Sequence, residues 1–227
     1  MPTTPDAVII EPSAGHRASV IWLHGLGADG HDFEPILPEL RLPHDHGIRF
    51  IFPHAPVRPV TINGGMVMRA WYDVRSQDLR RDEDVDAIEE AKEIVNRYIN
   101  TEIKRGIDPG RIVIAGFSQG GAITLHCGLR YPACLGGLLA LSCYLPLPGR
   151  LAVEKSLANQ TIPILMLHGV FDPVIPMQTG QQSCDYLRQA GYNVEWRTYP
   201  MQHSVCLEEL QHIGQWLKSI LVQSGTS

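Results

Sequence analysis

The pentapeptide Gly-Phe-Ser-Gln-Gly at residues 116–120 has the G-x-S-x-G spacing in which a serine can act as a nucleophile. The apolar run 111–115 before it predicts a strand, and residues 121–125 continue with helical character. A strand, a sharp turn and a helix would raise the Ser118 hydroxyl at the apex of the turn, where crowding favours glycine at both ends of the pentapeptide. We therefore predict that Ser118 is a nucleophile whose hydroxyl is held clear of the carboxyl edge of a sheet.

A serine nucleophile needs a base, and in sites of this kind the partners follow in the chain order Ser, acid, His. Two histidines in the last part of the chain, His203 and His212, are considered as the base. His212 lies in the predicted helix 205–221, outside its apolar face, which points it toward solvent. His203 instead comes in a loop after the predicted strand 193–199, where a base can be presented to the serine. We therefore predict His203 as the base.

An acid is needed to orient the imidazole of the base. The acids between the serine and the histidine are Glu154, Asp172, Asp185 and Glu195. Glu154 and Asp185 are interpreted as solvated charges on helices, and Glu195 lies within a strand. Asp172 directly follows the apolar strand 162–167, so we select it. Taken alone, an Asp-Pro pair here is as typical of an ordinary turn.

Two backbone amides are expected to stabilise the oxyanion that forms when such a serine attacks a carbonyl. One is the N–H of Gln119, directly after the nucleophile. The predicted strand 18–23 ends in the glycine-rich loop 24–27, whose glycines let an amide approach a substrate oxygen closely. We assign the second donor to the N–H of Leu26.

The same loop carries an alternative interpretation, because residues 25–30 satisfy G-x-G-x-x-G after a strand. That fingerprint would predict a dinucleotide cofactor and an oxidoreductase, with an acid at the end of the next strand to bind the ribose. Here the candidate acid, Asp45, comes before the next strand, 48–52. The serine interpretation uses the same glycines and also accounts for the proposed acid and base, so we expect no cofactor.

Other candidate ligands are weaker. His44 and His46 suggest a metal pair, but no third ligand follows at convincing spacing, so we expect a solvated loop and no metal. The cysteines are Cys127, Cys134, Cys143, Cys184 and Cys206. Their odd number and the lack of a C-x-x-C pattern or a signal peptide predict reduced thiols in a cytoplasmic protein.

Composition indicates a compact enzyme. The chain has 227 residues, of which 44% are hydrophobic, and we expect one α/β domain over 1–227. A net charge of −5 and an isoelectric point near 6.0 argue against a nucleic-acid partner. No apolar stretch approaches the roughly 20 residues of an integral membrane segment.

The elements that must position these residues alternate along the chain. Strands are predicted over 7–11, 18–23, 48–52, 111–115, 136–141, 162–167 and 193–199, and helices over 31–40, 82–104, 119–130, 177–190 and 205–221. Such alternation predicts an α/β fold with a mostly parallel, doubly wound sheet flanked by helices. All three proposed catalytic residues follow strands, which agrees with a site at the carboxyl ends of the strands.

With these motifs the chain resembles the carboxylesterase/phospholipase family of α/β-hydrolases, which includes the acyl-protein thioesterases. The matching segments are 23–27, 71–73, 116–121, 141–146, 168–169 with 172–174, and 201–204, and they span nearly the whole length. The resemblance implies an α/β-hydrolase fold and hydrolysis of acyl esters and thioesters by Ser118, Asp172 and His203. It also implies Leu26 and Gln119 as the oxyanion donors. Family members often form homodimers, so the resemblance makes a homodimer possible for this chain as well.

Two positions depart from the family pattern, namely Pro200, where many eukaryotic thioesterases carry glycine, and Tyr144, where they often carry tryptophan. Both lie close to predicted site elements, so chain-length preference is not carried over. Our main prediction is a serine carboxylesterase for short to medium acyl chains on small-molecule or lipid esters. The alternative is an acyl-protein thioesterase or lysophospholipase acting on long chains, and a third hypothesis is a binding protein that keeps the fold without turnover.

The sequence says least about which residues bind the substrate. Residues 143–160 are too few for a cap domain, so we predict an open site without a large lid. Apolar residues expected to line an acyl groove are Met66, Val67, Met68, Trp71, Tyr144, Leu145, Val174 and Ile175. Each of them taken singly is more typical of core or dimer contacts.

Overall fold

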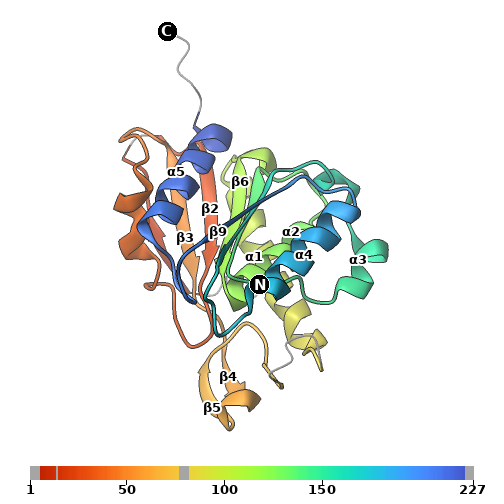
Figure 1. Ribbon diagram of the computed structural model, residues 1–227. Coiled ribbons are helices and arrows are strands. Elements are labelled where there is room, and N and C mark those ends of the chain that lie inside the picture. Colours follow the sequence, from red (N-terminus) through yellow and green to blue (C-terminus); the bar gives the residue numbers. More distant parts are fainter. Residues whose placement is uncertain (1–5, 14, 77–81, 223–227) are drawn as a thin grey trace.

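The computed structural model describes residues 6–13, 15–76 and 82–222 and is built around a seven-stranded sheet (Figure 1). The strands are β1 (Ala7–Ile10), β2 (Ala18–Leu23), β3 (Ile48–Pro53), β6 (Ile112–Phe117), β7 (Gly137–Leu141), β8 (Ile164–Gly169) and β9 (Val194–Tyr199). Their order across the sheet is β1-β3-β2-β6-β7-β8-β9. Only the β1–β3 pairing is antiparallel; the other pairings in this sheet are parallel. The predicted α/β-hydrolase fold with a mostly parallel sheet is thus confirmed.

Helices cover both faces of the sheet. They are α1 (Val85–Lys104), α2 (Gln119–Gly128), α3 (Pro148–Glu154), α4 (Met177–Gln189) and α5 (Leu207–Leu221). Side chains of α1, α2 and α4 pack in one hydrophobic cluster, and those of α5 pack in a second cluster on the opposite face (Figure 1). None of the described helices is long and apolar enough to cross a membrane.

The central strands are buried on both sides, which explains their nearly continuous apolar sequences. Along β2, Ile21 and Leu23 belong to the cluster beneath α1 and α2, whereas Val20 and Trp22 belong to the cluster beneath α5. This alternation follows from the two-residue period of a strand. The core therefore consists of two layers, one on each face of the sheet. Both layers pack against the central strands, whose carboxyl ends lead into the loops of the predicted site.

Three elements differ from the sequence predictions. The expected helix 31–40 is instead a 3-10 segment, η1 (Glu34–Leu40), because Pro35 and Pro38 remove amide donors that an α-helix would need. A hairpin of β4 (Val57–Val60) and β5 (Met66–Arg69), joined through η2 (Thr61–Asn63), was not predicted. Helix α3 was not predicted either, since it is short and begins with Pro-Gly. The remaining short segments are η3 (Pro109–Arg111) and η4 (Leu157–Asn159).

The hairpin projects beyond the edge of the sheet (Figure 1). It begins four residues after β3 ends, so it extends the carboxyl edge of the strands. The Gly27 amide donates to the Arg69 carbonyl over 2.9 Å, which ties the loop after β2 to the hairpin. The hairpin therefore forms part of the surroundings of the predicted site.

Candidate active site

Ser118 stands alone between β6, which ends at Phe117, and α2, which begins at Gln119. Its φ of 55° and ψ of −120° are rare for a residue with a side chain and are retained only where the surroundings hold them in place. The Ser118 amide donates to the Leu141 carbonyl over 2.8 Å, and its carbonyl accepts from the Ala122 amide over 3.1 Å. The turn is thus fixed from both the sheet and the helix.

The glycines around Ser118 are required by space. A Cβ atom at Gly116 would lie 2.3 Å from the Gly120 carbonyl oxygen, and one at Gly120 would lie 2.4 Å from the Leu23 carbonyl oxygen. Side-chain atoms cannot approach backbone oxygens this closely without moving them. The predicted steric reason for the G-x-S-x-G spacing is therefore present in the structure.

Three side chains from separate loops form a chain of hydrogen bonds. His203 Nε2 lies 2.8 Å from Ser118 Oγ, and His203 Nδ1 lies 2.7 Å from Asp172 Oδ2. An ionised carboxylate only accepts hydrogen bonds, so Nδ1–H donates to Asp172 and the neutral ring presents Nε2 as an acceptor for the serine hydroxyl. The structure therefore brings the predicted serine, base and acid together in the geometry of proton transfer.

Asp172 is held in its ionised form by its surroundings. Its other oxygen, Oδ1, accepts from the amides of Val174 and Ile175 over 2.8 and 2.9 Å. Burial raises the pKa of Asp172, but the hydrogen bonds from His203 and these two amides outweigh burial, and the net pKa is lowered. The turn at Asp172-Pro173 also places the carboxylate against His203, so the turn interpretation and the acid interpretation are compatible.

Two further histidines support the loops from within the core. His24 accepts from the Ala55 amide at Nε2 over 3.0 Å and donates from Nδ1 to the Gly25 carbonyl over 2.7 Å. Burial lowers the pKa of His24 to about 4, so the ring stays neutral. His168 Nε2 donates to the Ile175 carbonyl over 2.8 Å and fixes the segment after Asp172.

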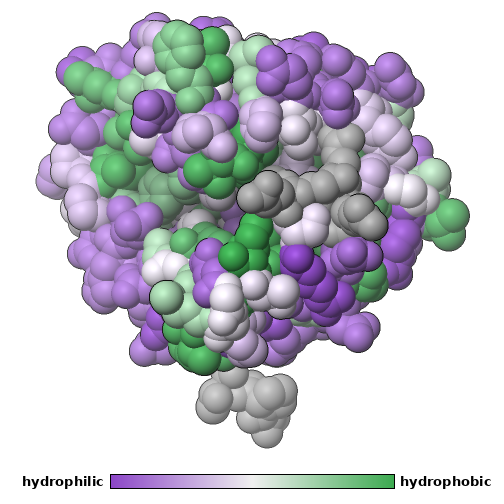
Figure 2. All heavy atoms as spheres, turned by 60° about the horizontal axis from the view of Figure 1, so that its bottom comes forward, coloured by the Kyte–Doolittle hydropathy of each residue, from purple (hydrophilic) through white to green (hydrophobic). Residues whose placement is uncertain are grey.

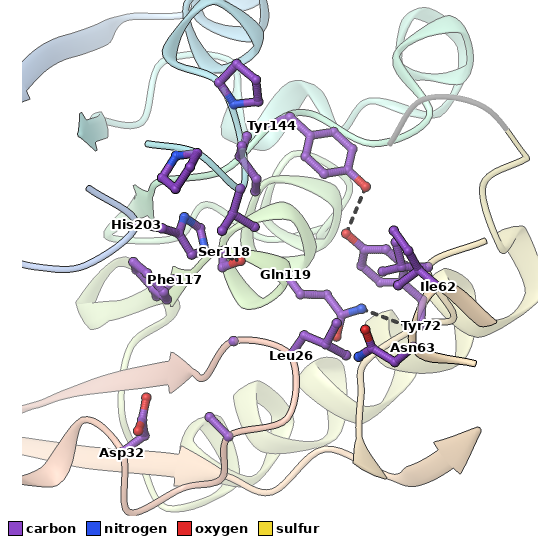
Figure 3. Close-up of a pocket in the computed structure, with 17 residues that line it drawn as sticks. Leu26, Asp32, Ile62, Asn63, Tyr72, Phe117, Ser118, Gln119, Tyr144 and His203 are labelled. Carbon is purple, nitrogen blue, oxygen red and sulfur yellow. Dashed lines mark hydrogen bonds between the residues drawn. The ribbon is translucent and has the colours of Figure 1, made fainter. Parts of the chain in front are cut away.

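Leu26 and Gln119 both line the cavity beside Ser118 (Figure 3). Gln119 is the first residue of α2, so its amide N–H has no acceptor within its own helix. The loop that carries Leu26 packs closely on the turn, since a Cβ atom at Gly25 would lie 3.4 Å from Ser118 Cβ. Both predicted oxyanion donors therefore belong to segments in contact with the serine.

The Gln119 side chain connects α2 to the segment after the hairpin. Its Oε1 accepts from the Trp71 amide and its Nε2 donates to the Tyr72 carbonyl, each over 2.7 Å. The Trp71 indole in turn donates to the His24 carbonyl over 2.9 Å. Gln119 and Trp71 thus hold three loops of the site in fixed relative positions.

The serine opens into a cavity of about 770 Å³. Its wall includes the loop after β2, η2, the turn around Ser118, the segment 173–176, and the side chains of Tyr72, Val74, Tyr144 and His203. Figure 2 looks onto the face that carries the hairpin, where apolar side chains gather around a hollow. This arrangement gives the serine an apolar, concave surface that is open to solvent.

Only some of the predicted groove residues line this cavity. Tyr144, Val174 and Ile175 do. The described cavity wall does not include Met66, Val67, Met68, Trp71 or Leu145.

The five predicted residues that do not line the cavity are kept out of it for different reasons. Met66 and Val67 are 63% and 65% exposed on the unpredicted hairpin, and Met68 accepts from Asn63 at its sulfur on the same hairpin. Trp71 is buried beneath the loops, and Leu145 lines a smaller cavity of about 160 Å³ beside α4.

Sequence reasoning missed several wall residues, notably Ile62, Tyr72, Val74 and Phe117. Trp71 and Tyr72 lie in a bend after β5, where the structure buries Trp71 beneath the loops and places Tyr72 in the cavity wall. Ile62 could be found only by recognising the hairpin.

The alternative ligand sites are accounted for by local structure. His46 Nδ1 accepts from the Ile48 amide over 2.8 Å, as part of the turn before β3. Within residues 6–13, 15–76 and 82–222 there is no cluster of three potential metal ligands.

All five cysteines are free thiols, with Cys134 exposed and Cys206 partly buried. His212, expected toward solvent, is instead partly buried and accepts from the Tyr199 hydroxyl over 2.9 Å.

Comparison with known proteins agrees with this geometry. Residues 4–221 match the phospholipase/carboxylesterase family. The chain is 39% identical over 225 residues to acyl-protein thioesterase 1 of Gibberella zeae, covering 95% of this chain and 96% of that one. It is 42% identical over 219 residues to acyl-protein thioesterase 1 of Neurospora crassa, covering 92% and 89%. Among solved structures, Arabidopsis thaliana SOBER1 superposes with a TM-score of 0.85 at 36% identity, covering 90% and 99%.

The fold and these similarities define a serine hydrolase of the α/β-hydrolase class that acts on acyl esters. Within that class, the chain belongs to the phospholipase/carboxylesterase family.

Proposed function

We propose that the protein hydrolyses acyl thioesters and esters through an acyl-enzyme on Ser118, and that S-acylated proteins are its substrate class. The hydrogen-bonded chain from Ser118 through His203 to Asp172, opening into a large apolar cavity, carries the chemical part of this proposal. The names of the relatives at 39% and 42% identity support the thioesterase. They favour the long-chain alternative over a short-chain carboxylesterase and over a binding protein without turnover.

The first half of the reaction acylates the serine. Ser118 Oγ attacks the acyl carbonyl while His203 Nε2 takes its proton, and ionised Asp172 stabilises the imidazolium that forms. The negative charge on the tetrahedral intermediate is stabilised by the amides of Leu26 and Gln119. Losing one such donor typically costs about 3–4 kcal/mol of transition-state stabilisation.

The second half frees the acid. The imidazolium of His203 protonates the departing sulfur or oxygen, and the thiol or alcohol leaves. Water then enters, His203 takes one of its protons, and the resulting oxygen nucleophile attacks the acyl-enzyme carbonyl. Collapse of the second intermediate returns the proton to Ser118 and releases the carboxylic acid.

A protein-sized leaving group requires an unobstructed approach to the serine. Between β7 and β8 the chain forms only loops, α3 and η4, which are too small to make a cap over the cavity. The exposed edge of the cavity therefore leaves room for a leaving group much larger than the acyl chain. This feature supports the proposed substrate class and is shared with esterases that take smaller leaving groups.

The test compares matched thioesters and oxygen esters of one cysteine- or serine-containing peptide, with acyl chains from about two to about sixteen carbons. We expect kcat/KM to rise roughly fourfold for each methylene that becomes buried, and to continue rising into long chains. Thioesters should be cleaved at least as fast as oxygen esters. A rise that stops within the first few carbons would instead support the short-chain carboxylesterase and contradict the proposal.

Two variants provide the baseline for this assay. Ser118→Ala should lower kcat by roughly 10⁶-fold, as in other enzymes with this catalytic arrangement. Ser204→Ala removes an exposed serine next to His203 and should leave kcat unchanged. A folded Ser118→Ala protein with most of its activity would exclude Ser118 as the nucleophile.

A further inference from the structure

Two tyrosine hydroxyls meet inside the cavity. The oxygens of Tyr72 and Tyr144 lie 3.0 Å apart and share a hydrogen bond (Figure 3). The side chains come from different parts of the chain, since Tyr72 follows β5 and Tyr144 follows β7. They are only 3% and 1% exposed, yet both line the cavity. A polar pair of this kind in an apolar cavity calls for a functional explanation.

The pair lies on the side of the serine opposite the base. In Figure 3, His203 and Phe117 lie on one side of Ser118, and Tyr72 and Tyr144 lie on the other. Because His203 must protonate the leaving atom, the leaving group has to depart on the His203 side. The acyl chain then extends the other way, toward the tyrosines.

Charged groups lie beyond the tyrosine pair. A second, very small cavity is lined by both tyrosines together with Asp73, Arg75 and Glu83. Arg75 pairs with Asp84 over 2.9 Å and with Asp73 over 3.5 Å. An apolar chain end gains nothing by entering such surroundings, because it would displace water from charged groups. The tyrosine pair thus separates an apolar compartment from a charged one.

The partition is fixed on both sides. The Tyr72 carbonyl accepts from Gln119 Nε2, which anchors it to the first turn of α2. On the other side, the Leu145 amide, next to Tyr144, donates to Ser183 Oγ of α4 over 3.0 Å. Burial and the neighbouring Tyr144 hold the pKa of Tyr72 well above its usual range, so the hydroxyl stays neutral.

We infer that the Tyr72–Tyr144 pair closes the acyl end of the cavity and sets the longest acyl chain that is bound in full. This inference rests on the proposed hydrolysis of acyl chains at Ser118. It assigns a specificity-determining role to a residue, Tyr144, at which the sequence departs from the family pattern. It also gives a reason for two buried hydroxyls that take no part in proton transfer.

The experiment measures kcat/KM over the acyl series for the wild type, Tyr144→Ala and Tyr144→Leu. In the wild type the rise with chain length should end at a definite carbon number. In Tyr144→Ala this limit should move outward by about three carbons, since the space left by the ring holds roughly that many methylenes, and in Tyr144→Leu it should move by about one carbon, because leucine refills most of that space. Beyond the wild-type limit, each added methylene should then raise kcat/KM roughly fourfold.

The controls separate the ring from the hydroxyl and from general destabilisation. Tyr144→Phe keeps the ring and should keep the wild-type limit. Tyr131→Phe removes a buried hydroxyl that donates to Asn100, away from the cavity, and should change nothing in the profile. Each profile is divided by the rate of the same variant with the acetyl ester, whose acyl group ends before the tyrosines, so a general loss of activity does not move the limit.

The outcomes separate the inference from the function on which it rests. An unchanged limit in Tyr144→Ala and Tyr144→Leu, with acetyl-ester activity retained, would overturn the inference and leave the proposed function intact. A wild-type protein that hydrolyses no member of the series would overturn both. An outward shift in the Ala and Leu variants, absent from Tyr144→Phe, is the result that supports the partition.

Discussion

At the scale of single residues, the state of each ionisable side chain follows from its immediate neighbours. Asp172 is buried but accepts from one imidazole and two amides, so its pKa falls. Glu209, in the first turn of α5, is buried more completely, and neither of its oxygens has a partner of good hydrogen-bond geometry among the described residues. Burial raises the pKa of Glu209 to about 8, against the smaller opposing effect of the Cys206 amide. Two buried carboxyls therefore differ in charge at neutral pH.

Replacing Asp172 with Asn should impair the base without unfolding the site. An amide can donate to His203 Nδ1, which would favour the tautomer in which Nε2 is protonated and cannot accept the serine proton. We expect kcat to fall by roughly 10⁴-fold, as for the equivalent change in other enzymes of this mechanism. Steady-state hydrolysis of a medium-chain ester measures the effect, and a loss of less than about tenfold would contradict the role given to Asp172.

Replacing Glu209 with Gln should stabilise the protein increasingly as pH rises. Between the ordinary pKa of 4.5 and about 8, Glu209 is ionised in the unfolded chain and protonated in the folded protein. The folded state then binds more protons, so its stability falls as pH increases across this range. The Gln variant lacks this loss, and its free energy of unfolding should exceed that of the wild type most at the alkaline end.

Urea unfolding at about pH 5 and about pH 8 measures this difference. Glu208→Gln, at the exposed neighbouring position, serves as the matched control and should show little change with pH. If the advantage of Glu209→Gln were the same at both pH values, or larger in acid, the buried carboxyl would not be protonated in the folded protein.

At the scale of elements, the position of α2 against β2 depends on the absence of a side chain at Gly120. A Cβ atom there would meet the carbonyl oxygens of Leu23 and His24 at 2.4 and 2.6 Å. Neither oxygen can move far, because the first belongs to the end of a central strand. The helix would have to shift, and with it the amide of Gln119 and the serine.

Gly120→Ala should therefore reduce both activity and stability. We expect kcat/KM to fall by at least about 100-fold, since displacements near 1 Å of catalytic groups suffice for such a loss. The free energy of unfolding should fall by about 1–3 kcal/mol. Gly149→Ala, in exposed α3 where a Cβ atom meets nothing within 4 Å, is the matched control and should be neutral or slightly stabilising. Wild-type activity in Gly120→Ala would contradict the tight contact described here.

The sequence predicts the sheet well because each buried strand is a short apolar run beside a turn. It also predicts Ser118, Asp172 and His203, since chain order and position after strands leave few candidates. The β4–β5 hairpin escapes prediction because Pro59 interrupts its first strand and both strands are largely exposed. The residues Asn63-Gly64-Gly65 were its one available turn signal. The cavity wall could not be predicted, because it combines loops whose relative placement depends on contacts such as that of Gln119 with Tyr72.

At the scale of the whole molecule, the two edges of the sheet carry different polar clusters. The carboxyl edge holds the candidate active site, and the opposite edge holds buried Glu102. Glu102 accepts from Ser19 over 2.6 Å and from Arg49 over 3.0 Å, and His16 lies 3.3 Å from it. This second cluster joins the end of α1 to the beginnings of β2 and β3. It stabilises the fold at a distance from the chemistry.

Arg49→Met should destabilise the protein while sparing catalysis. Removing one partner of a buried ion pair leaves an uncompensated charge and typically costs about 3–5 kcal/mol. Urea unfolding should reveal this loss, and kcat of the folded enzyme should remain within about twofold of the wild type. Arg197→Met breaks an exposed pair with Glu195 and should cost less than about 1 kcal/mol. A selective loss of kcat in folded Arg49→Met would contradict the separation of the two edges.

The central claim is that Ser118, activated by His203, is the nucleophile of this hydrolase. Intact-protein mass spectrometry after treatment with a fluorophosphonate tests it most directly, because such a reagent forms a stable bond with an activated serine. We expect one adduct on the wild type and on Ser204→Ala, and none on Ser118→Ala. An adduct on folded Ser118→Ala, or no adduct on folded wild type, would contradict the account.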